Sequence, residues 1–363
     1  MAKRRSEVFI RDEVGAYHCF NRIVRRRHLF GIDPVTGKNY NYRKDWVRKE
    51  FRRLAKEMAI QVLDYAVLSN HLHAVLRNRP DIVSTWSNAE VVRRWWRTCP
   101  RRRKPNGKPA KARPHELREL MGEVDELRKR LSDVSWIMRL AQQRVAQRAN
   151  KQDDMEGRFF ARRFGCERLE TEADVLACSL YVDLNWIHAG MAKTPEDSQY
   201  TSAFERIRGR WDENARATVS ADVEPDDKFD GNWLAPIFVD ERAEAYVGPK
   251  DLPAVASIEM RLETLTTEPL DIEKLEAENE KPTFYNPVGS DRVSDRGFLA
   301  MKLEEYLQML DRVGRQIRKD KPGSIPKSLP PILERLGIDA RSWYESLIDR
   351  FMSAPNPSLL PHA

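Results

Sequence analysis

The chain has 363 residues, 41% of them hydrophobic, which is enough for one or two globular domains with a buried core. Its longest apolar runs fall far short of the roughly 20 residues that a membrane-spanning helix needs. The first residues are basic and then acidic, without the apolar centre of a signal peptide. The four cysteines lie far apart and form no CxxC pair, which suits reduced thiols. We therefore expect a globular cytoplasmic protein that does not contact a membrane.

The net charge of +7 is distributed unevenly along the chain. Residues 93–113 include ten lysines and arginines and no acidic residue, whereas residues 212–281 contain nineteen acidic and seven basic residues. A cationic first part without an amphipathic lipid-binding stretch indicates binding to nucleic acid. Trp86, Trp95 and Trp96 flank or interrupt the basic run and could stack on unpaired bases. The alternatives are a solvated charged face and, for Trp95 and Trp96, the buried side of a short helix.

A strand, a helix and a hairpin are predicted in the first 80 residues. Residues 16–24 alternate between apolar and polar as a strand does, and residues 44–59 place their apolar side chains on one side of a helix. Residues 61–77 then contain two strand-like runs separated by Ser69 and Asn70, a pair typical of tight turns. These two runs predict a β-hairpin.

His71 and His73 lie one residue apart in the second run of this hairpin. Successive side chains of a strand point to opposite faces, so both imidazoles should lie on one face while Leu72 points into the other layer. Two neutral imidazoles on a stiff strand can share a metal ion, which then needs at least one more ligand from elsewhere in the chain. The alternative is a pair of buried histidines in an ordinary strand.

A basic insertion follows the hairpin. Residues 105–114 are rich in proline, glycine and lysine and exclude regular structure, while residues 116–150 are rich in helix formers with apolar side chains at near-helical spacing. We predict that the insertion ends in a helix packed on the core. Residues 157–165 then read as a short aromatic strand or loop, whose outward-facing arginines suit contacts with phosphates.

Thr171 and Asp174 have the form of a capping box and predict the start of an amphipathic helix. Tyr181 and Asn185 lie four residues apart beside its apolar stripe, so a phenol hydroxyl and an amide oxygen could reach the same point in space. Asparagine is unfavourable inside a helix, and a role as ligand of a hard cation would explain it. The alternative is a helix nearing its end, which Gly190 supports.

Together these residues resemble the HUH single-strand nucleases, and among them the REP-associated tyrosine transposases and their insertion-sequence relatives. The name HUH describes two histidines that flank a hydrophobic residue, here His71, Leu72 and His73. Further stretches resemble the family in the same order, namely residues 17–18 with Arg22, residues 157–164, residues 181–185, and residues 189–190 with 201–202. The resemblance covers residues 10–210 and depends on order and spacing, because each stretch alone is weak.

Two positions depart from the family's pattern. The family usually has a proline directly after the asparagine and an arginine or lysine two residues further, whereas this chain has Trp186 and His188. Neither change removes an atom that the expected chemistry needs, although both can alter the end of the helix or a contact with DNA.

The resemblance implies an α+β fold with a central antiparallel sheet and flanking helices, the ferredoxin-like or RRM-like core of the HUH family. The catalytic domain would comprise residues 1–80 and 135–211, with residues 81–134 as a basic insertion. Residues 212–363 would form an acidic linker and a mainly helical or irregular C-terminal extension of unknown role, with helical spacing at 298–317 and 332–351.

The resemblance also implies a reaction. A Mg²⁺ or Mn²⁺ ion held by His71, His73 and Asn185 would polarise a phosphodiester of single-stranded DNA, and Tyr181 would cleave it through a 5′-phosphotyrosine intermediate. Single-stranded or hairpin DNA is the expected partner, and the protein is expected to be a monomer or homodimer. The alternatives are a DNA-binding relative without catalytic activity and a metal-dependent phosphodiesterase acting on RNA, in which Tyr181 is structural.

Ten arginines are candidates for contacts with DNA phosphates. They belong to the end of the first strand, to the basic insertion and to the stretch before the nucleophile helix. These arginines are Arg22, Arg25, Arg26, Arg27, Arg101, Arg102, Arg103, Arg158, Arg162 and Arg163.

Overall fold

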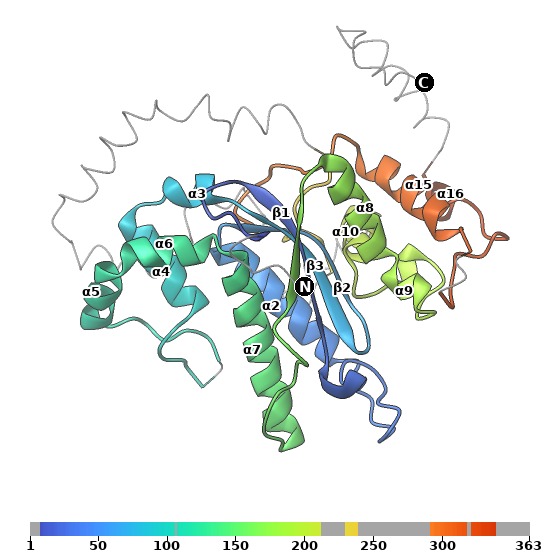
Figure 1. Cartoon of the computed structure of the whole chain (residues 1–363). Coiled ribbons are helices and arrows are strands. Elements are labelled where there is room, and N and C mark those ends of the chain that lie inside the picture. Colours follow the sequence, from blue (N-terminus) through green and yellow to red (C-terminus); the bar gives the residue numbers. More distant parts are fainter. Residues whose placement is uncertain (1–7, 106, 212–228, 239–290, 318–320, 339–363) are drawn as a thin grey trace, which may run out of the picture.

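A four-stranded antiparallel sheet forms the centre of the molecule (Figure 1). The computed structural model describes residues 8–105, 107–211, 229–238, 291–317 and 321–338. The strands are β1 (Gly15–Arg22), β2 (Ile60–Val67), β3 (His71–Asn78) and β4 (Gly165–Leu169), in the order β2-β3-β1-β4 across the sheet. All three strand pairs are antiparallel, and β2 and β3 form the predicted hairpin.

Helices cover both faces of this sheet. Those before β4 are α2 (Arg43–Glu57), α3 (Pro80–Ser84), α4 (Asn88–Thr98), α5 (Pro114–Gly122), α6 (Val124–Leu131) and α7 (Val134–Asp153). Those after β4 are α8 (Glu172–Asp183), α9 (Asn185–His188), α10 (Ser202–Trp211), α15 (Leu303–Gly314) and α16 (Ile332–Arg335). Helices α2 and α7 pack on one face, and α8 and α10 pack on the other, with α15 against α8.

Local sequence explains where several helices begin. Ser87 caps α4 by accepting a hydrogen bond from the Glu90 amide at 3.2 Å, and Asp133 caps α7 in the same way. Thr171 and Asp174 form the predicted capping box of α8, in which each side chain accepts a hydrogen bond from the other residue's amide. These caps fix the starts of the two helices, α7 and α8, that lie on opposite faces of the sheet.

Strand alternation divides the core into two apolar layers. On β1, Tyr17 and Cys19 point into the layer beneath α2 and α7, while Ala16 points into the layer beneath α8 and α10. On β3, Leu72 points into the layer beneath α2 and α7, and Val75 points into the layer beneath α8 and α10. His18 and His73 therefore lie on the α8 side, because they keep step with Ala16 and Val75.

The C-terminal residues that the structure describes pack against the same sheet. Leu234 bridges Val62 at the outer edge of β2, and Trp233 is fully buried and donates its indole N–H to Glu205. Tyr306 of α15 donates its hydroxyl to Asp183 at 2.7 Å. An edge strand without cover would be open to pairing with other chains, so this segment protects β2.

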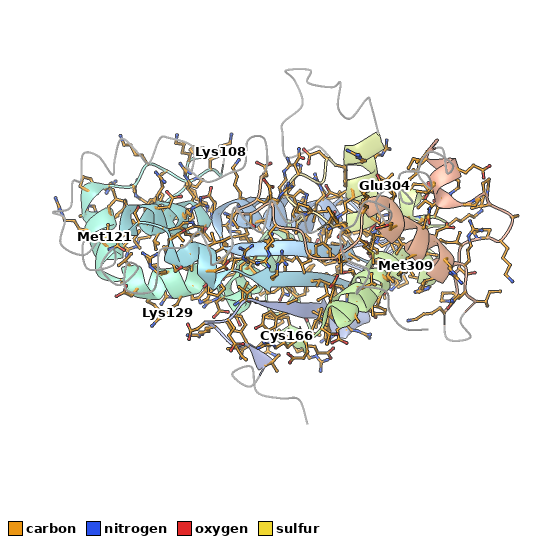
Figure 2. The ribbon with its side chains drawn as sticks, turned by 90° about the horizontal axis from the view of Figure 1, so that it is seen from above. Lys108, Met121, Lys129, Cys166, Glu304 and Met309 are labelled. Atoms are coloured by element: carbon orange, nitrogen blue, oxygen red, sulfur yellow. The ribbon has the colours of Figure 1, made fainter. Side chains whose placement is uncertain are left out.

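The basic insertion is folded and forms one end of the molecule. Figure 2, seen from above, shows Lys108, Met121 and Lys129 at that end, and Glu304 and Met309 of α15 at the opposite end. The predicted helical part of the insertion is divided among α5, α6 and α7, and the loop before α5 contains the proline-rich stretch.

The observed α+β architecture agrees with the prediction. The proposed stacking role of the tryptophans is wrong, because Trp86, Trp95 and Trp96 are buried in the core, where their large apolar rings are removed from water. The helix predicted at 298–317 is α15, whereas most of the run at 332–351 and most of the acidic stretch lie outside the described residues. In the described part of the chain, no helix combines the length and apolarity that crossing a bilayer requires.

Candidate functional site

Three histidines from two neighbouring strands meet on the α8 side of the sheet. The antiparallel register pairs Phe20 of β1 with His73 of β3, which places His18 diagonally across from His73. His18 Nε2 lies 2.9 Å from His73 Nδ1, and the rings of His71 and His73 are 5.1 Å apart, centroid to centroid. The predicted pair of histidines is therefore part of a cluster of three.

Hydrogen bonds determine which ring nitrogens carry protons. His71 Nδ1 lies 2.6 Å from Asn70 Oδ1, which can only accept, so His71 Nδ1–H donates and Nε2 keeps its lone pair. The Glu167 carboxylate lies 4.0 Å from His18 Nδ1 and favours a proton there. His18 Nε2 then accepts from His73 Nδ1–H, and His73 Nε2 also keeps its lone pair.

Burial keeps all three imidazoles neutral at pH 7. It lowers the pKa of His18 to about 4 and that of His71 to about 4, and it lowers the pKa of His73 well below the ordinary value. The neighbouring His71 and His18 rings lower the pKa of His73 further. Neutral imidazoles are the form that binds a metal ion.

Tyr181 lies beside these histidines near the C-terminal end of α8. Its ring centroid is 5.6 Å from that of His73 and 6.1 Å from that of His18, nearly perpendicular to both. Tyr181 is 36% exposed and lines the same cavity as the histidines. The tyrosine is therefore both packed beside the histidines and accessible to a ligand from solvent.

Helix α8 ends at Asp183, and the short helix α9 begins at Asn185. Asn185 therefore lies near the end of the helical stretch, as the alternative interpretation of the sequence expects. Its Nδ2 donates to the carbonyl oxygen of Tyr181 at 2.9 Å, which directs Oδ1 away from that carbonyl. Trp186 is buried and donates its indole N–H to Val67 O at 2.8 Å. This hydrogen bond ties α9 to the end of β2 and so helps to position Asn185.

One cavity of about 930 Å³ brings these side chains together. His71, His73, Tyr181 and Asn185 all contribute to its lining, so the structure places the four predicted residues around one space. Their chemical roles stay predictions.

The same cavity is lined by four cationic side chains and one carboxylate. The cations come from the end of β1, the loop before β4 and the C-terminal part of the chain, and they are Arg22, Arg25, Arg162 and Lys321. The carboxylate is that of Glu167. Arg25 has a φ of 53°, a left-handed conformation that is unfavourable for arginine and that often occurs at functional sites. The excess of positive charge suits an anionic ligand.

The donor set fits a divalent cation. His71, His73 and Asn185 line one cavity, the Nε2 atoms of both imidazoles keep their lone pairs, and oxygens of water or phosphate can complete the coordination. Among the described residues, no group of three or more His, Cys, Asp or Glu side chains is placed to hold a metal ion. A metal at this site would therefore depend on Asn185 or water for its third ligand.

Four titratable residues of the cavity lining have no role assigned from the sequence: His18, Glu167, His188 and Lys321. His18 lies in a stretch that resembles the first strand of the HUH family, and this resemblance is the sequence feature that could have indicated a role for it. His188 stands where the resemblance expects an arginine or lysine. Lys321 is far from the other residues in sequence, so no local pattern could have indicated it.

Several of the predicted DNA-binding arginines lie elsewhere. Arg27 is paired with Asp33, and Arg158 is exposed but does not line the cavity. Arg163 lines a second cavity, and the side chain of Arg26 is outside the described part of the chain.

The three insertion arginines are engaged within the insertion itself. Arg101 pairs with Glu119, Arg102 pairs with Glu116 at 2.8 Å, and Arg103 donates to Gly107 O. The Arg102 guanidinium lowers the pKa of Glu116 to about 2. DNA would have to compete with these contacts, so their role in binding stays a prediction.

Comparison with known proteins gives one distant structural likeness. No protein-family model matches the chain, and no curated protein matches it. The structure is similar, with a TM-score of 0.34 and 13% identity, to that of a REP-associated tyrosine transposase bound to a REP hairpin. This similarity covers 58% of this chain and 87% of the other.

Proposed function

We propose that this protein is a metal-dependent endonuclease and strand transferase of the HUH type, acting on single-stranded DNA that forms hairpins. The observation that carries the proposal is the convergence of His71, His73, Asn185 and Tyr181 on one cavity with cationic walls. These residues come from a strand and from two helices on one face of the sheet.

The order of the elements supports the proposal. A βαββαβ chain with sheet order β2-β3-β1-β4 has the ferredoxin-like arrangement expected of the HUH core. Within this arrangement, β3 supplies the two histidines and α8 supplies the tyrosine from the layer above. A fold alone does not determine function, so the proposal depends mainly on the residues of the site.

The histidines and Asn185 would hold Mg²⁺ or Mn²⁺. A bound ion would withdraw charge from a non-bridging oxygen of the phosphodiester and so ease the approach of a nucleophile. Asn70 Oδ1 accepts a hydrogen bond from His71 Nδ1–H, and His18 Nε2 accepts one from His73 Nδ1–H, so the Nε2 atoms of His71 and His73 stay available.

Tyr181 would act as the nucleophile. Its phenolic oxygen loses a proton to solvent and forms a bond to phosphorus, the P–O3′ bond breaks, and the departing 3′ oxygen takes up a proton. The resulting 5′-phosphotyrosine preserves an activated bond, so that a second 3′-hydroxyl can reverse the step and join strands. A nuclease that used water would lose that bond, and this difference explains the use of tyrosine.

Covalent trapping tests the proposal directly. The protein is incubated with Mn²⁺ and 3′-labelled single-stranded DNA from the flanks of its own gene, and adducts are detected by denaturing electrophoresis. Tyr181→Phe should lose the adduct while it retains the fold, because only an exposed hydroxyl is removed. Tyr200→Phe, a tyrosine outside the cavity lining, is the matched control and should form the adduct.

Each other result has a definite meaning. An adduct that persists in Tyr181→Phe and disappears in Tyr200→Phe would assign the nucleophile to Tyr200. Binding without any adduct in the wild-type protein would favour the non-catalytic relative, and metal-dependent RNA cleavage that survives Tyr181→Phe would favour the phosphodiesterase.

A further inference from the structure

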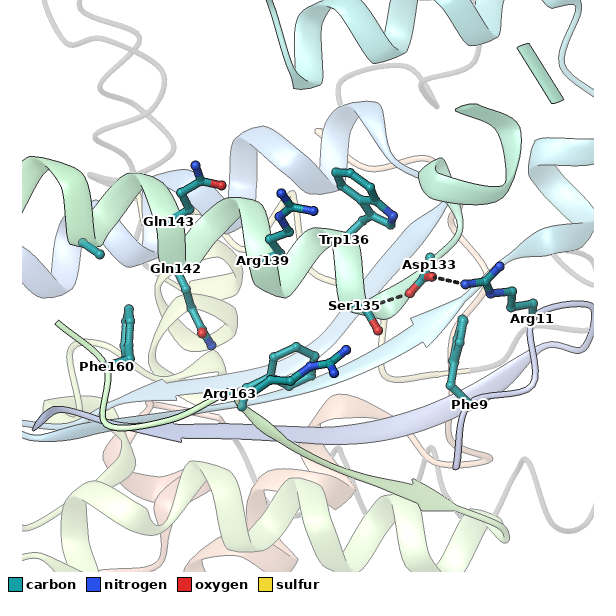
Figure 3. A pocket seen from close by; sticks show the side chains of 12 residues that line it. Phe9, Arg11, Asp133, Ser135, Trp136, Arg139, Gln142, Gln143, Phe160 and Arg163 are labelled. Atoms are coloured by element: carbon teal, nitrogen blue, oxygen red, sulfur yellow. Dashed lines mark hydrogen bonds and ion pairs between the residues drawn. The ribbon is translucent and has the colours of Figure 1, made fainter. Parts of the chain in front are cut away.

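A second cavity, of about 750 Å³, lies on the side of the sheet that α7 covers (Figure 3). Its walls are α7, the N-terminal residues 9–11 and the loop before β4. It therefore lies across the sheet from the layer that contains Tyr181. Its volume is within the range of small-ligand sites.

Aromatic rings and guanidinium groups share the lining of this cavity. The rings include Phe9, Trp136 and Phe160, and the Arg139 guanidinium lies 4.7 Å from the centroid of the Trp136 ring. Flat rings beside cations are the combination that holds an unpaired base and its phosphate, because the base stacks while the charge neutralises the backbone.

The charge of the lining is positive. Arg11 lies 3.6 Å from Asp133, whereas Arg139 and Arg163 form no ion pair with any carboxylate that the structure describes. Asp133 also accepts a hydrogen bond from the Ser135 amide as the cap of α7, so its carboxylate is already engaged. Two guanidinium groups thus remain to bind an anion.

Gln142 provides an independent sign of a ligand. Its Oε1 accepts a hydrogen bond from Asn21 Nδ2 at 2.9 Å, which fixes the orientation of the amide. Its Nε2 is buried and has no hydrogen-bond partner in the described structure, although the side chain lines the cavity. A buried donor without an acceptor costs free energy, and a base carbonyl or phosphate oxygen would satisfy it. Figure 3 shows this side chain pointing from α7 toward the loop with Phe160 and Arg163.

The two cavities share one segment of the chain. Phe160 pairs with Ile23 beyond the end of β1, and the following residues divide between the cavities. Ala161 and Arg162 line the cavity of Tyr181, whereas Arg163 lines the second. The two cavities therefore meet at adjacent residues of one segment, whose Cα atoms are only ~3.8 Å apart.

We propose that the second cavity holds an unpaired nucleotide of the same DNA strand whose phosphodiester lies at Tyr181. Its base would stack on the aromatic wall, and its phosphate would contact Arg139 and Arg163. The inference rests on the proposed function for the strand at Tyr181. Duplex DNA does not fit this role, because its bases are stacked on one another and present no face to Trp136 or Phe160.

Photocrosslinking tests this placement. The full chain is bound to single-stranded 20-mers of deoxythymidine, each with one 5-iododeoxyuridine at a different position, irradiated, and mapped by mass spectrometry. Crosslinks from one or two adjacent positions should fall on Phe9, Trp136 or Phe160. Replacing both Arg139 and Arg163 by glutamine should lower this crosslink yield at least fivefold.

Arg148→Gln is the matched control, because Arg148 is also on α7 and also stacks on a tryptophan, Trp46, but lies outside the cavity lining. It should leave the crosslink yield unchanged. The inference is overturned if bound 20-mers crosslink only outside this cavity, if the control and the double variant lose yield equally, or if the protein binds no single-stranded DNA.

The adduct assay is separate and distinguishes the two proposals. A Tyr181 adduct without cavity crosslinks overturns this inference and leaves the function in place. Cavity crosslinks without any adduct support the nucleotide site and overturn the catalytic role of Tyr181.

Discussion

Replacing Arg162 by glutamine should reduce the salt dependence of DNA binding by a defined amount. The Arg162 side chain is exposed, lines the cavity of Tyr181 and forms no ion pair with a described carboxylate. Arg22, Arg25 and Lys321 also line this cavity and form no ion pair with a described carboxylate. Four cations are therefore available to bind phosphates. Glu167 is the opposing charge.

The expected size follows from counterion release. Each phosphate neutralised on a single strand contributes about −0.7 to the slope of log affinity against log salt concentration, so four contacts give about −3 and three give about −2. Between roughly 50 and 200 mM salt, affinity should fall about 50-fold for the four-cation protein and about 20-fold for the variant.

Fluorescence anisotropy with a labelled hairpin oligonucleotide measures both slopes. Tyr181→Phe serves as the background, so that covalent capture does not distort the equilibrium. Arg101→Gln is the control, because Arg101 already pairs with Glu119 and does not line the cavity. Its loss frees a carboxylate instead of only removing a cation. If Arg162→Gln leaves the slope unchanged while Arg101→Gln flattens it by about 0.7, the DNA path runs over the insertion and the reasoning is refuted.

Three further changes test separate parts of the structure. His18→Phe should lower Mn²⁺ affinity about 10–100-fold by calorimetry, because it removes the acceptor that orients His73, with metal-free DNA binding unchanged. Arg25→Gly should stabilise the fold by about 0.5–1 kcal/mol in chemical denaturation, since glycine tolerates the left-handed φ, yet weaken DNA binding. Tyr306→Phe should destabilise the fold by about 1–3 kcal/mol, because it leaves the buried Asp183 carboxyl without this hydrogen bond; an unchanged denaturation midpoint would contradict this.

The positions of His71, His73, Tyr181 and Asn185 were predictable because each pair is local. A strand's period of two puts the histidines on one face, and a helical spacing of four brings Tyr181 and Asn185 together. The convergence of the two pairs was expected from family resemblance, since periodicity does not specify how a helix lies across a sheet.

His18 and Lys321 show why the periodicity of strands and helices does not reveal the rest of the site. His18 joins the cluster only through the register of β1 against β3, which depends on residues 55 positions apart in sequence. Lys321 reaches the cavity from beyond the last predicted catalytic residue, in a segment with no motif. Such long-range contacts follow from packing of the whole chain and leave no local pattern.

Several cations of the basic run have carboxylate partners within the protein. Arg94 is fully buried against Glu90, and Arg101 and Arg102 pair with glutamates of α5. The tryptophans of the same run lie on the buried side of an amphipathic helix, where burial of a large ring is favoured. A cluster of like charges in sequence is therefore a weaker indication of a nucleic-acid surface than unpaired cations around one cavity.

The C-terminal part of the chain supports α8 and α9 as well as contributing Lys321 to the cavity. Tyr306 binds Asp183, which lies two residues after Tyr181 and also accepts a hydrogen bond from the Ala203 amide at 3.0 Å. At the end of α9, a side chain at Gly323 would collide with the carbonyl oxygen of Ile187, so the segment after Lys321 packs tightly there. Asp183, within the Tyr181–Asn185 stretch, and Ile187, just after it, are thus contacted by residues from outside the part of the chain that resembles the HUH family. The geometry of the site is consequently a property of the longer chain, and substitutions in α15 that break this support should disturb Tyr181 without touching DNA or metal.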